Sequence, residues 1–398
     1  MINQQSGKLL DKLPKITFWR VLFVITIACG AYSTWLRFFR GLGASTNLTD
    51  QFPWGLWIGF DVLCGVMLAA GGFTLMATVH IFNAKRFKPI ARPALLTAFL
   101  GYLLVIAALM FDLGRPYRIW HPLVMWNPRS VMFEVGWCVT LYTSVLSLEF
   151  LPIVFERLRF EQPLRILRMI SVPLFILGII LSTLHQSSLG SLYLIVPGKL
   201  HPLWYSPLLP VFFFLSAIAV GLAMTIFEST MSSRHFNHQL EKPLILDLGR
   251  ILLVVLIVYA LLRAQDLFRR DVLKFAFNTT QEASMFWVEV GLALIVPIIL
   301  MLVRKIRENP MSLYVVSIMV VAGFLVNRLN VAVTGMERSA GVTYVPRWTE
   351  VAVTLSIVAA GIALFAAAVK YLPIFHEMPP ARADRRVPPA TAAPAQAG

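Results

Sequence analysis

Ten runs of about 20 mainly apolar residues recur along the chain, and they limit its fold more than any other feature. A helix of about 20 residues crosses a bilayer core of roughly 30 Å. Lipid offers no hydrogen bonds, so each run must satisfy its own backbone, and the alternating pattern of barrel strands is missing. The sequence therefore predicts an all-α polytopic membrane protein with ten transmembrane helices, at 17–39, 54–83, 92–112, 131–155, 166–186, 206–230, 243–265, 285–304, 311–331 and 348–372.

Composition and charge support this class. Hydrophobic residues make up 58% of the chain and charged residues 14%, against about 45–50% and about 25% in soluble domains. The net charge of +15 is spread over the flanks of the helices, which favours contact with anionic lipid over a nucleic-acid role. Lysine and arginine are more frequent on the N-terminal side of the membrane, so both termini are predicted to be cytoplasmic. We interpret 1–375 as one membrane domain and 376–398 as a disordered cytoplasmic tail.

An internal repeat is visible when the helices are compared. The third predicted helix ends Asp112-Leu-Gly-Arg115 and the seventh ends Asp266-Leu-Phe-Arg269. The helix that follows opens with MFEVG in the first case and MFWVEVG in the second. Because the copies are four helices apart, they would share one orientation in the membrane. The pattern predicts two similar four-helix bundles, helices 2–5 and helices 6–9, flanked by helices 1 and 10.

Ionisable side chains at membrane depth are costly and indicate functional sites. Asp61 lies seven residues into the second predicted helix, and Glu134 lies near the start of the fourth. Asp112 and Arg115, at the outer end of the third, could belong to a site or form a structural ion pair. For Glu228, Arg328 and Glu350, each close to a helix end, the alternative is that the side chain reaches the membrane surface. These three residues then need no function.

The stretch STLHQSSLGSLYL, residues 182–194, closes the fifth apolar run with hydrogen-bonding side chains. His185 can donate to a ligand carbonyl and relay a proton, because its pKa lies near neutrality. Gln186, Ser187 and Ser188 could orient the same ligand. The alternative is a helix C-terminal cap that satisfies the last backbone carbonyls.

Histidine and cysteine positions argue against a haem or a metal site. The two histidines inside predicted helices, His80 and His185, lie at opposite ends of the membrane, so no pair of axial ligands shares a depth. Cys29, Cys64 and Cys138 lie in apolar helices without C-x-x-C spacing. We predict no haem and no metal in this chain. No P-loop, dinucleotide-binding fingerprint or hydrolase triad is present either.

Five motifs, taken in order, resemble one family. They are FPWGLWI from Phe52 with Asp61, Asp112-Leu-Gly-Arg115, Phe133-Glu134, HQSSLGSL from His185, and His201-Pro-Leu-Trp204. Together they resemble the membrane subunit of hydrogenase-2-type nickel–iron hydrogenases, within the NrfD/polysulfide reductase membrane-subunit family. The resemblance covers the chain up to its tail.

The resemblance implies a fold of two four-helix bundles and a location in the bacterial inner membrane. It implies partners, namely the large and small subunits of a Ni/Fe hydrogenase and a periplasmic ferredoxin-like iron–sulfur subunit. The chain would then anchor the complex and exchange electrons with membrane quinone, menaquinone or ubiquinone, without reacting with hydrogen itself. Coupled proton movement across the membrane is a further feature proposed for the family. Family members are often named b-type cytochromes yet are haem-free.

Quinone reduction needs two electrons, two protons and donors to the carbonyl oxygens, so the residues above receive roles. Glu134 matches the family's acid on the fourth helix, and we expect it to be buried. The predicted proton carriers are Glu134, Asp61 and His185. The predicted quinone site consists of His185, Gln186, Ser187, Ser188, Asp112, Arg115 and Trp57.

Two alternatives stay open. The chain could serve another oxidoreductase of the same family, acting on polysulfide or nitrite. It could also be a secondary transporter built on a parallel repeat, although a transporter needs a midplane site and the ionisable groups here gather near the two faces.

Overall fold

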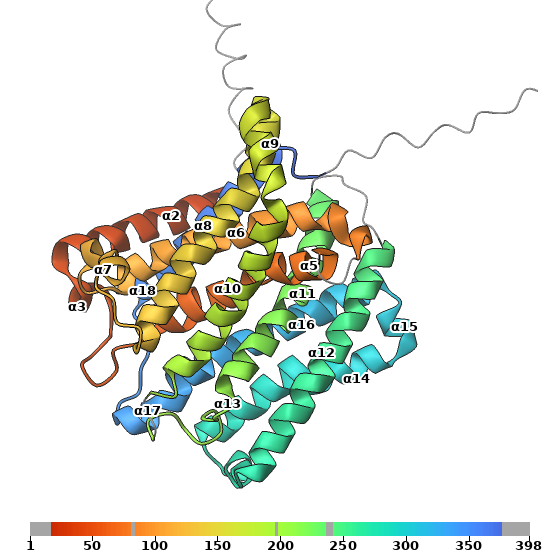
Figure 1. Ribbon diagram of the computed structural model, residues 1–398. Coiled ribbons are helices and arrows are strands. Elements are labelled where there is room, and N and C mark those ends of the chain that lie inside the picture. The colour runs from red at the N-terminus through yellow and green to blue at the C-terminus, as the bar shows by residue number, and fades with distance from the viewer. Residues whose placement is uncertain (1–16, 81–83, 196–197, 236–241, 376–398) are drawn as a thin grey trace, which may run out of the picture.

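The computed structural model describes residues 17–80, 84–195, 198–235 and 242–375, and this part of the chain is almost entirely helical, without a β-strand (Figure 1). The prediction of ten helices long and apolar enough to cross a membrane is confirmed. The proposed tail lies outside the described residues. The spans are Phe18–Arg40, Trp57–Val79, Lys88–Asp112, Val131–Leu158, Ser171–Leu192, Leu209–His235, Lys242–Arg269, Gln281–Leu302, Pro310–Ala340 and Trp348–Tyr371.

Four of the spans contain a π-helical segment, which no sequence pattern indicated. Such segments occur often at functional sites. The segmented spans are α2 (Phe18–Trp35) with η1 (Leu36–Arg40); η2 (Trp57–Cys64) with α4 (Gly65–Leu68) and α5 (Gly71–His80); α13 (Gln281–Val290) with η6 (Gly291–Ile295) and α14 (Val296–Leu302); and α16 (Pro310–Leu329) with η7 (Asn330–Thr334) and α17 (Gly335–Ala340). The others are α6 (Lys88–Asp112), α8 (Val131–Leu158), α10 (Ser171–Leu192), α11 (Leu209–His235), α12 (Lys242–Arg269) and α18 (Trp348–Tyr371).

Short helices lie at the two ends of the bundle. Figure 1 shows α9 (Glu161–Met169) and α15 (Arg304–Arg307) at one end, and α3 (Leu42–Ser45), α7 (His121–Val124) and α17 at the other. The turns η3 (Lys85–Phe87), η4 (Pro116–Arg118) and η5 (Leu273–Phe277) complete the described helical elements. This grouping places the predicted cytoplasmic loops together and the predicted outer loops together.

The fifth predicted helix has the wrong bounds. The segment Glu161–Met169 is a separate amphipathic helix, α9, and such a helix is suited to lie at a membrane surface rather than to cross it. The spanning helix α10 then runs on to Leu192, six residues past the expected end. Serine hydroxyls in this stretch donate to carbonyls one turn back, as Ser187 does to Thr183 and Ser191 to Ser187, so they do not cap the helix end. The HQSS residues therefore lie within the helix, and the capping alternative is wrong.

Helix α11 is central. It packs against α5 and α10 on one side and against α12 and α16 on the other. The first helices form a closed ring of contacts, from α5 to α6, α8, α10 and back to α5. Among the later helices, α14 contacts both α12 and α16. Helices α2 and α18 pair beside them. The division into two similar repeated bundles stays a prediction, although these neighbours are compatible with it.

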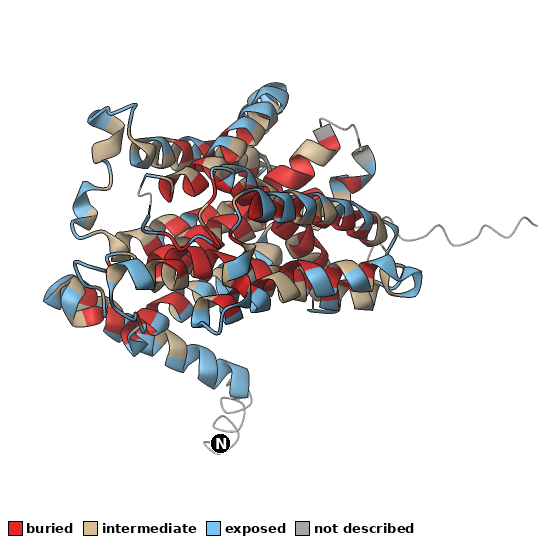
Figure 2. Cartoon of the chain, turned by 90° about the horizontal axis from the view of Figure 1, so that it is seen from below, coloured by how far each residue is buried: buried red, intermediate tan, exposed pale blue. Residues whose placement is uncertain are grey.

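Small residues allow the closest helix contacts. Burial is concentrated in the middle of the bundle, and much of α2 faces outward (Figure 2). A Cβ atom on Gly221 of α11 would lie 2.9 Å from the Ala70 carbonyl, and one on Gly323 of α16 would overlap the backbone of Ala293 in η6. Membrane helices gain little from burying apolar surface against each other, so close backbone packing contributes much of their association.

Candidate functional site

Glu134 and Ser188 meet at the outer end of α8 and α10. The Ser188 hydroxyl lies 2.5 Å from a Glu134 carboxylate oxygen and 2.8 Å from the Leu184 carbonyl, and its single proton can serve either acceptor. Glu134 sits in the first turn of α8, whose N-cap Ser130 accepts a bond from the Phe133 amide. The sequence motifs thus predicted two residues that the fold brings together. The expectation that Glu134 is buried is wrong, because its side chain is exposed at this end of the bundle.

His185 lies one helical turn below Ser188 and is 0% exposed. Its ring is 5.7 Å from the ring of Tyr102 on α6, which in turn packs edge-on against Tyr142 on α8. Neither ring nitrogen of His185 has a hydrogen-bond partner, and the same holds for the Tyr102 and Ser182 hydroxyls. Buried polar atoms are normally paired, so these side chains form a cluster of unpartnered polar atoms in the core.

Gln186 and Ser187, the neighbours of His185, point elsewhere. The Gln186 amide donates to the Val66 carbonyl at 3.2 Å and so fastens α10 to α4. The Ser187 hydroxyl bonds to carbonyls of its own helix, those of Thr183 and Leu184. Both side chains therefore bond to the protein backbone and contribute to helix packing.

Asp61 and Trp57, on the π-helical segment η2, hold α18 in place. The Thr354 hydroxyl donates to Asp61 at 2.8 Å, and the Trp57 indole donates to the Glu350 carbonyl at 3.2 Å. Trp57 is 1% exposed, so its indole ring is covered by protein atoms, including the Phe111 ring. Trp57, predicted as part of the quinone site, therefore lies in the core of this structure.

Glu350 does not reach the membrane surface, contrary to the alternative considered for it. It is 0% exposed. The Tyr344 hydroxyl donates to it at 2.7 Å, and the Arg347 and Asn47 amides donate at 2.6 and 3.3 Å. Tyr344 lies in the loop before α18, and burial raises the pKa of its phenol. This cluster closes the outer end of α18 against the loop around Asn47.

Asp112 and Arg115 do not form the ion pair that was considered for them: no salt bridge joins them within the described chain, and Arg115 is exposed. Arg37 of η1 reaches this end of α6 instead and donates to the carbonyls of Phe111 at 2.5 Å and Leu113 at 2.6 Å. Arg37 thereby satisfies carbonyls at the C-terminal end of α6, where backbone acceptors lack partners within the helix.

A second buried network surrounds Glu289, which the repeat pairs with Glu134. The Trp204 indole and the Asn327 and Asn330 amides donate to its carboxylate at 2.7, 2.7 and 2.9 Å. The Asn327 carbonyl oxygen then accepts from Arg328 at 2.9 Å. Glu289 is 4% exposed, so three donors compensate for its burial.

Arg328 supplies the cation of this network. It is 1% exposed, and the alternative that it reaches the membrane surface is wrong. Its guanidinium donates to the Ser216 hydroxyl at 2.7 Å and to the Phe213 carbonyl at 3.2 Å, and it lies 3.5 Å from the centre of the Phe213 ring. The sequence indicated Arg328 as a charge at membrane depth and Glu289 as part of the repeat, whereas nothing in it marked Asn327 or Ser216 as their partners.

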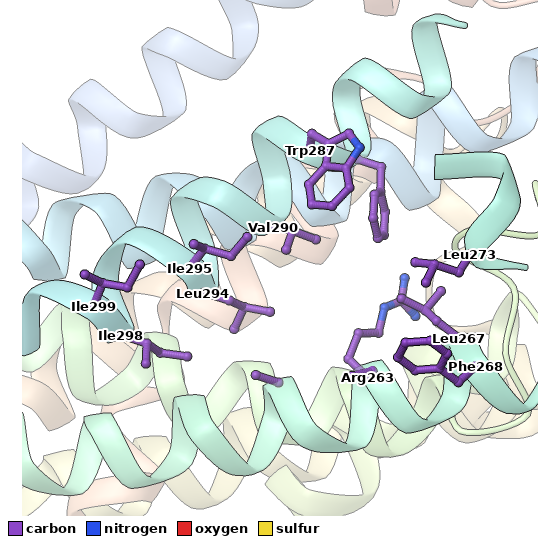
Figure 3. Close-up of a pocket in the computed structure, with 13 residues that line it drawn as sticks. Arg263, Leu267, Phe268, Leu273, Trp287, Val290, Leu294, Ile295, Ile298 and Ile299 are labelled. Atoms are coloured by element: carbon purple, nitrogen blue, oxygen red, sulfur yellow. The ribbon is translucent and has the colours of Figure 1, made fainter. Parts of the chain in front are cut away.

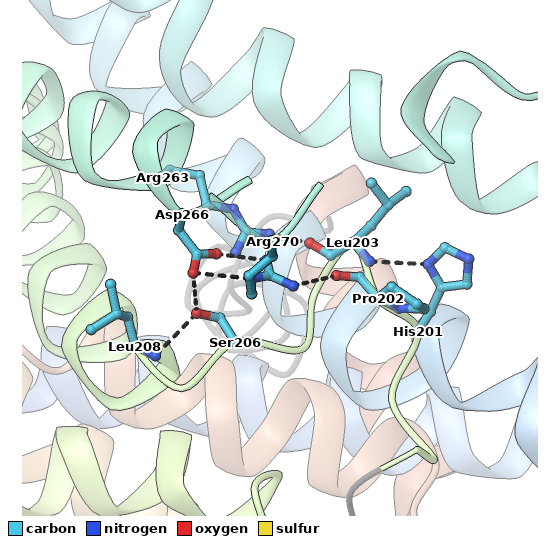
Figure 4. Close-up of polar contacts among 8 residues, drawn as sticks. All are labelled: His201, Pro202, Leu203, Ser206, Leu208, Arg263, Asp266 and Arg270. Carbon is cyan, nitrogen blue, oxygen red and sulfur yellow. Dashed lines mark hydrogen bonds and ion pairs between the residues drawn. The ribbon is translucent and has the colours of Figure 1, made fainter. Parts of the chain in front are cut away.

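The outer rim of the second half is held by Asp266 (Figure 4). Its carboxylate accepts from Ser206 at 2.7 Å and forms an ion pair with Arg270 at 2.6 Å. The repeated Asp-x-x-Arg spacing suggested Arg269, which is exposed instead. Residues three and four apart both lie on one face of a helix, and here the residue four positions on, Arg270, is the partner.

His201, the first residue of the HPLW motif, lies on this rim. Its Nδ1 atom accepts a bond from the Leu203 amide at 3.3 Å, and its own amide donates to the Gly335 carbonyl. Burial lowers the pKa of His201; nearby Glu282 opposes this shift, and Arg338 adds to it. The neutral form is therefore the one that the fold favours.

A cavity of about 290 Å³ lies away from Glu134, between α12 and the span formed by α13, η6 and α14 (Figure 3). Its walls are apolar apart from Arg263. No sequence motif indicated it, since most of its lining residues belong to ordinary apolar runs.

Comparison with known proteins identifies relatives over nearly the full length. A protein of Nitratidesulfovibrio vulgaris is 37% identical over 365 residues, which cover 89% of this chain and 94% of the relative. The probable Ni/Fe-hydrogenase 2 b-type cytochrome subunit of Escherichia coli is 35% identical over 343 residues, covering 85% and 87%. The menaquinone reductase integral membrane subunit of N. vulgaris is 30% identical over 392 residues, covering 91% and 93%.

The name of the E. coli relative raises the question whether a haem fits this chain. The described histidine side chains within the spans do not form a facing pair: His185 packs on Tyr102 in the core, and His235 lies exposed at the end of α11. No group of three His, Cys, Asp or Glu side chains suited to a metal occurs in the described part. The side chains of His80, His238 and His376 lie outside it, so a haem-free and metal-free chain stays a prediction.

The sequence model named "Polysulphide reductase, NrfD" matches residues 44–340. The match runs from α3 to α17 and contains Glu134, His185 and Ser188 as well as the Glu289 network. It covers more than half of the chain, and it agrees with relatives that are named as subunits of membrane complexes. The chain therefore belongs to the NrfD polysulphide reductase family of integral membrane subunits.

Proposed function

We propose that this chain is the membrane anchor and quinone-reactive subunit of a Ni/Fe hydrogenase complex. It passes electrons between iron–sulfur clusters of partner subunits and the membrane quinone pool. Two relatives support this proposal by their names, one a Ni/Fe-hydrogenase 2 subunit and the other a menaquinone reductase subunit. The ten spans supply the anchor.

The partners are the hydrogenase large and small subunits and a periplasmic ferredoxin-like subunit. They dock on the end of the bundle that carries α3, α7 and α17, opposite the basic inner loops (Figure 1). The complex lies in a bacterial inner membrane, with both termini in the cytoplasm. The excess of lysine and arginine in the loops of the other end supports this orientation.

The observation that carries the site is the Glu134–Ser188 contact above the buried His185. Glu134 is open to a ligand at the outer end of α8, and a carboxylic acid can deliver a proton to a carbonyl oxygen. Ser188 orients that carboxyl group. His185, with both ring nitrogens unpartnered, can replace the proton that Glu134 gives up, through water or a small shift of the ring. Electrons arrive from the partner's clusters.

The other predicted residues support this site from a distance. Gln186 fixes α10 against α4, and Asp61 and Trp57 fix η2 against α18. Asp112 and the exposed Arg115 lie at the end of α6, where a quinone ring could pass between helix ends. Ser187 bonds to backbone carbonyls of its own helix, α10. We assign positioning roles to Gln186, Ser187, Asp61 and Trp57.

Hydrogen-dependent reduction of a short-chain quinone by the purified complex tests the site. Glu134→Gln removes the proton while keeping the size of the side chain, and we expect kcat/KM to fall at least tenfold, since general acid catalysis contributes about 10²–10⁴-fold. Glu282→Gln is the matched control, because Glu282 is the acid in the first turn of α13. Hydrogen oxidation with a dye that takes electrons from the partner subunits should be unchanged in both. Full quinone reduction by Glu134→Gln would remove this site assignment.

A second candidate is the quinone-linked subunit of another oxidoreductase in the same family. The observation that favours it is the menaquinone reductase relative, which matches 91% of this chain at 30% identity. Affinity purification of the chain from its native membrane separates the two. Nickel in stoichiometric amount supports the hydrogenase, and a partner without nickel supports the alternative.

A further inference from the structure

The cavity between α12 and the α13–α14 span has an ordered lining. Aromatic side chains lie toward its outer end, from Phe268 at the end of α12 and from Phe286 and Trp287 on α13. Aliphatic side chains continue toward the membrane centre, from Leu294 to Ile299. Trp287 and Ile299 are 12 residues apart, or about 18 Å along a helix. The cavity therefore changes from a site suited to a flat ring to one suited to a hydrocarbon chain.

Arg263 is the one charged residue of the lining and lies at the aromatic end. Figure 3 shows its side chain rising from α12 beside Leu267 and Phe268. The residue is 4% exposed, and one terminal nitrogen donates to the Leu203 carbonyl at 2.7 Å. Its Nε–H has no acceptor. A buried donor without an acceptor is rare in native proteins and indicates a missing partner.

The cavity borders the lipid-facing surface. Phe268 and Ile299 are 69% and 59% exposed, and both line it. A ligand dissolved in the bilayer can therefore enter from the side, between α12 and α14. Asp and Glu side chains are missing from its lining, so the site offers no acid to a bound carbonyl.

We propose that this cavity is a second quinone site, which holds one isoprenoid quinone without reducing it. The ring lies against Phe268, Phe286 and Trp287 with a carbonyl oxygen accepting the Arg263 Nε–H, and the tail follows Leu294 to Ile299. A phospholipid fits less well, because its charged phosphate needs more than the one donor that the lining provides. The choice of quinone as ligand rests on the proposed function, which makes quinone the substrate of this chain. The cavity and its unpartnered donor are independent of that function.

Photolabelling of the intact complex in lipid nanodiscs tests the second site. The probe is an azido-benzoquinone with an isoprenoid chain, and labelled peptides are located by mass spectrometry. We expect label on 281–302 in the wild type. Val290→Trp fills the cavity and should reduce that label at least tenfold. Val288→Trp is the matched control, because Val288 is 45% exposed on the same helix and does not line the cavity. Arg263→Leu should also reduce the label, and it keeps the lining apolar.

Two results would overturn the second site. One is unchanged labelling of 281–302 in Val290→Trp. The other is labelling of 281–302 by a phospholipid with a photoreactive acyl chain that stays the same when excess unlabelled quinone is added. That result would make the cavity a lipid site.

The reaction site is tested separately. Glu134→Gln should leave the label on 281–302 unchanged. If Glu134→Gln keeps full quinone reduction while Val290→Trp still loses the label, the proposed reaction site fails and the second site stands. If quinone reduction falls in Glu134→Gln but 281–302 is never labelled, only the second site fails.

Discussion

Replacing Trp204 with phenylalanine tests whether Glu289 is charged inside the membrane. The Trp204 indole donates to Glu289 at 2.7 Å, and both residues are buried. A hydrogen bond to a charged group contributes about 1.5–3 kcal/mol, against about 1 kcal/mol for a neutral pair. Suppose that Glu289 is a carboxylate, linked to the Arg328 cation by the Asn327 side chain that bonds to both. Trp204→Phe should then lower the free energy of unfolding by about 2 kcal/mol or more, because it removes a charged hydrogen bond and also leaves a small cavity.

A double-mutant cycle with Glu289→Gln cancels the destabilisation that comes from the small cavity left by Trp204→Phe. Glutamine keeps the acceptor at nearly the same size but carries no charge. In the Glu289→Gln background, Trp204→Phe should therefore cost about 1 kcal/mol less than in the wild type. Reversible unfolding of the purified chain in mixed detergent and dodecyl sulfate micelles, followed by circular dichroism, measures each free energy.

Trp287→Phe provides the matched control. Its indole also donates at 2.7 Å, but to the neutral Ala276 carbonyl, so Glu289→Gln should not change its cost. A coupling energy near zero between Trp204 and Glu289 would refute the reasoning, because it would mean that Glu289 is protonated or that the indole bond adds nothing to stability.

Two further predictions follow from the network and the outer rim. Arg328→Leu leaves Glu289 without a nearby cation and should lower the free energy of unfolding by about 3–5 kcal/mol. Arg269→Leu, at an exposed position, should change it by less than about 0.5 kcal/mol in the same assay. A similar loss of stability in both variants would contradict the network. Because burial lowers the pKa of His201, the unfolded chain takes up a proton more readily than the folded one, so stability should fall as pH drops below about 6.5. The fall should be smaller in His201→Gln and unchanged in His121→Gln, and equal pH profiles in all three proteins would count against the assignment.

The class of the protein and its ten spans could be predicted from the sequence alone. The reason is physical: lipid requires each spanning segment to be long, apolar and internally bonded, and this requirement is written locally in each run. The pairing of Glu134 with the HQSS motif was also foreseeable, because both lie at the outer ends of adjacent helices. The bounds of α10 were not, because its polar stretch continues the helix, with serine hydroxyls bonded to carbonyls one turn back instead of capping the end.

Side-chain partners were decided by the tertiary structure. The Asp112-Leu-Gly-Arg115 spacing suggested a local ion pair, yet Arg37 from the first span reached the end of α6 instead. Glu289 accepts from Trp204 in a loop, from Asn327 on α16 and from Asn330 in a π-helical turn that no pattern marked. An apolar period shows which residues avoid water, but not which neighbour each will meet. Contacts between helices distant in sequence depend on crossing angles and close approaches, such as that at Gly323, and these arise only once the bundle has packed.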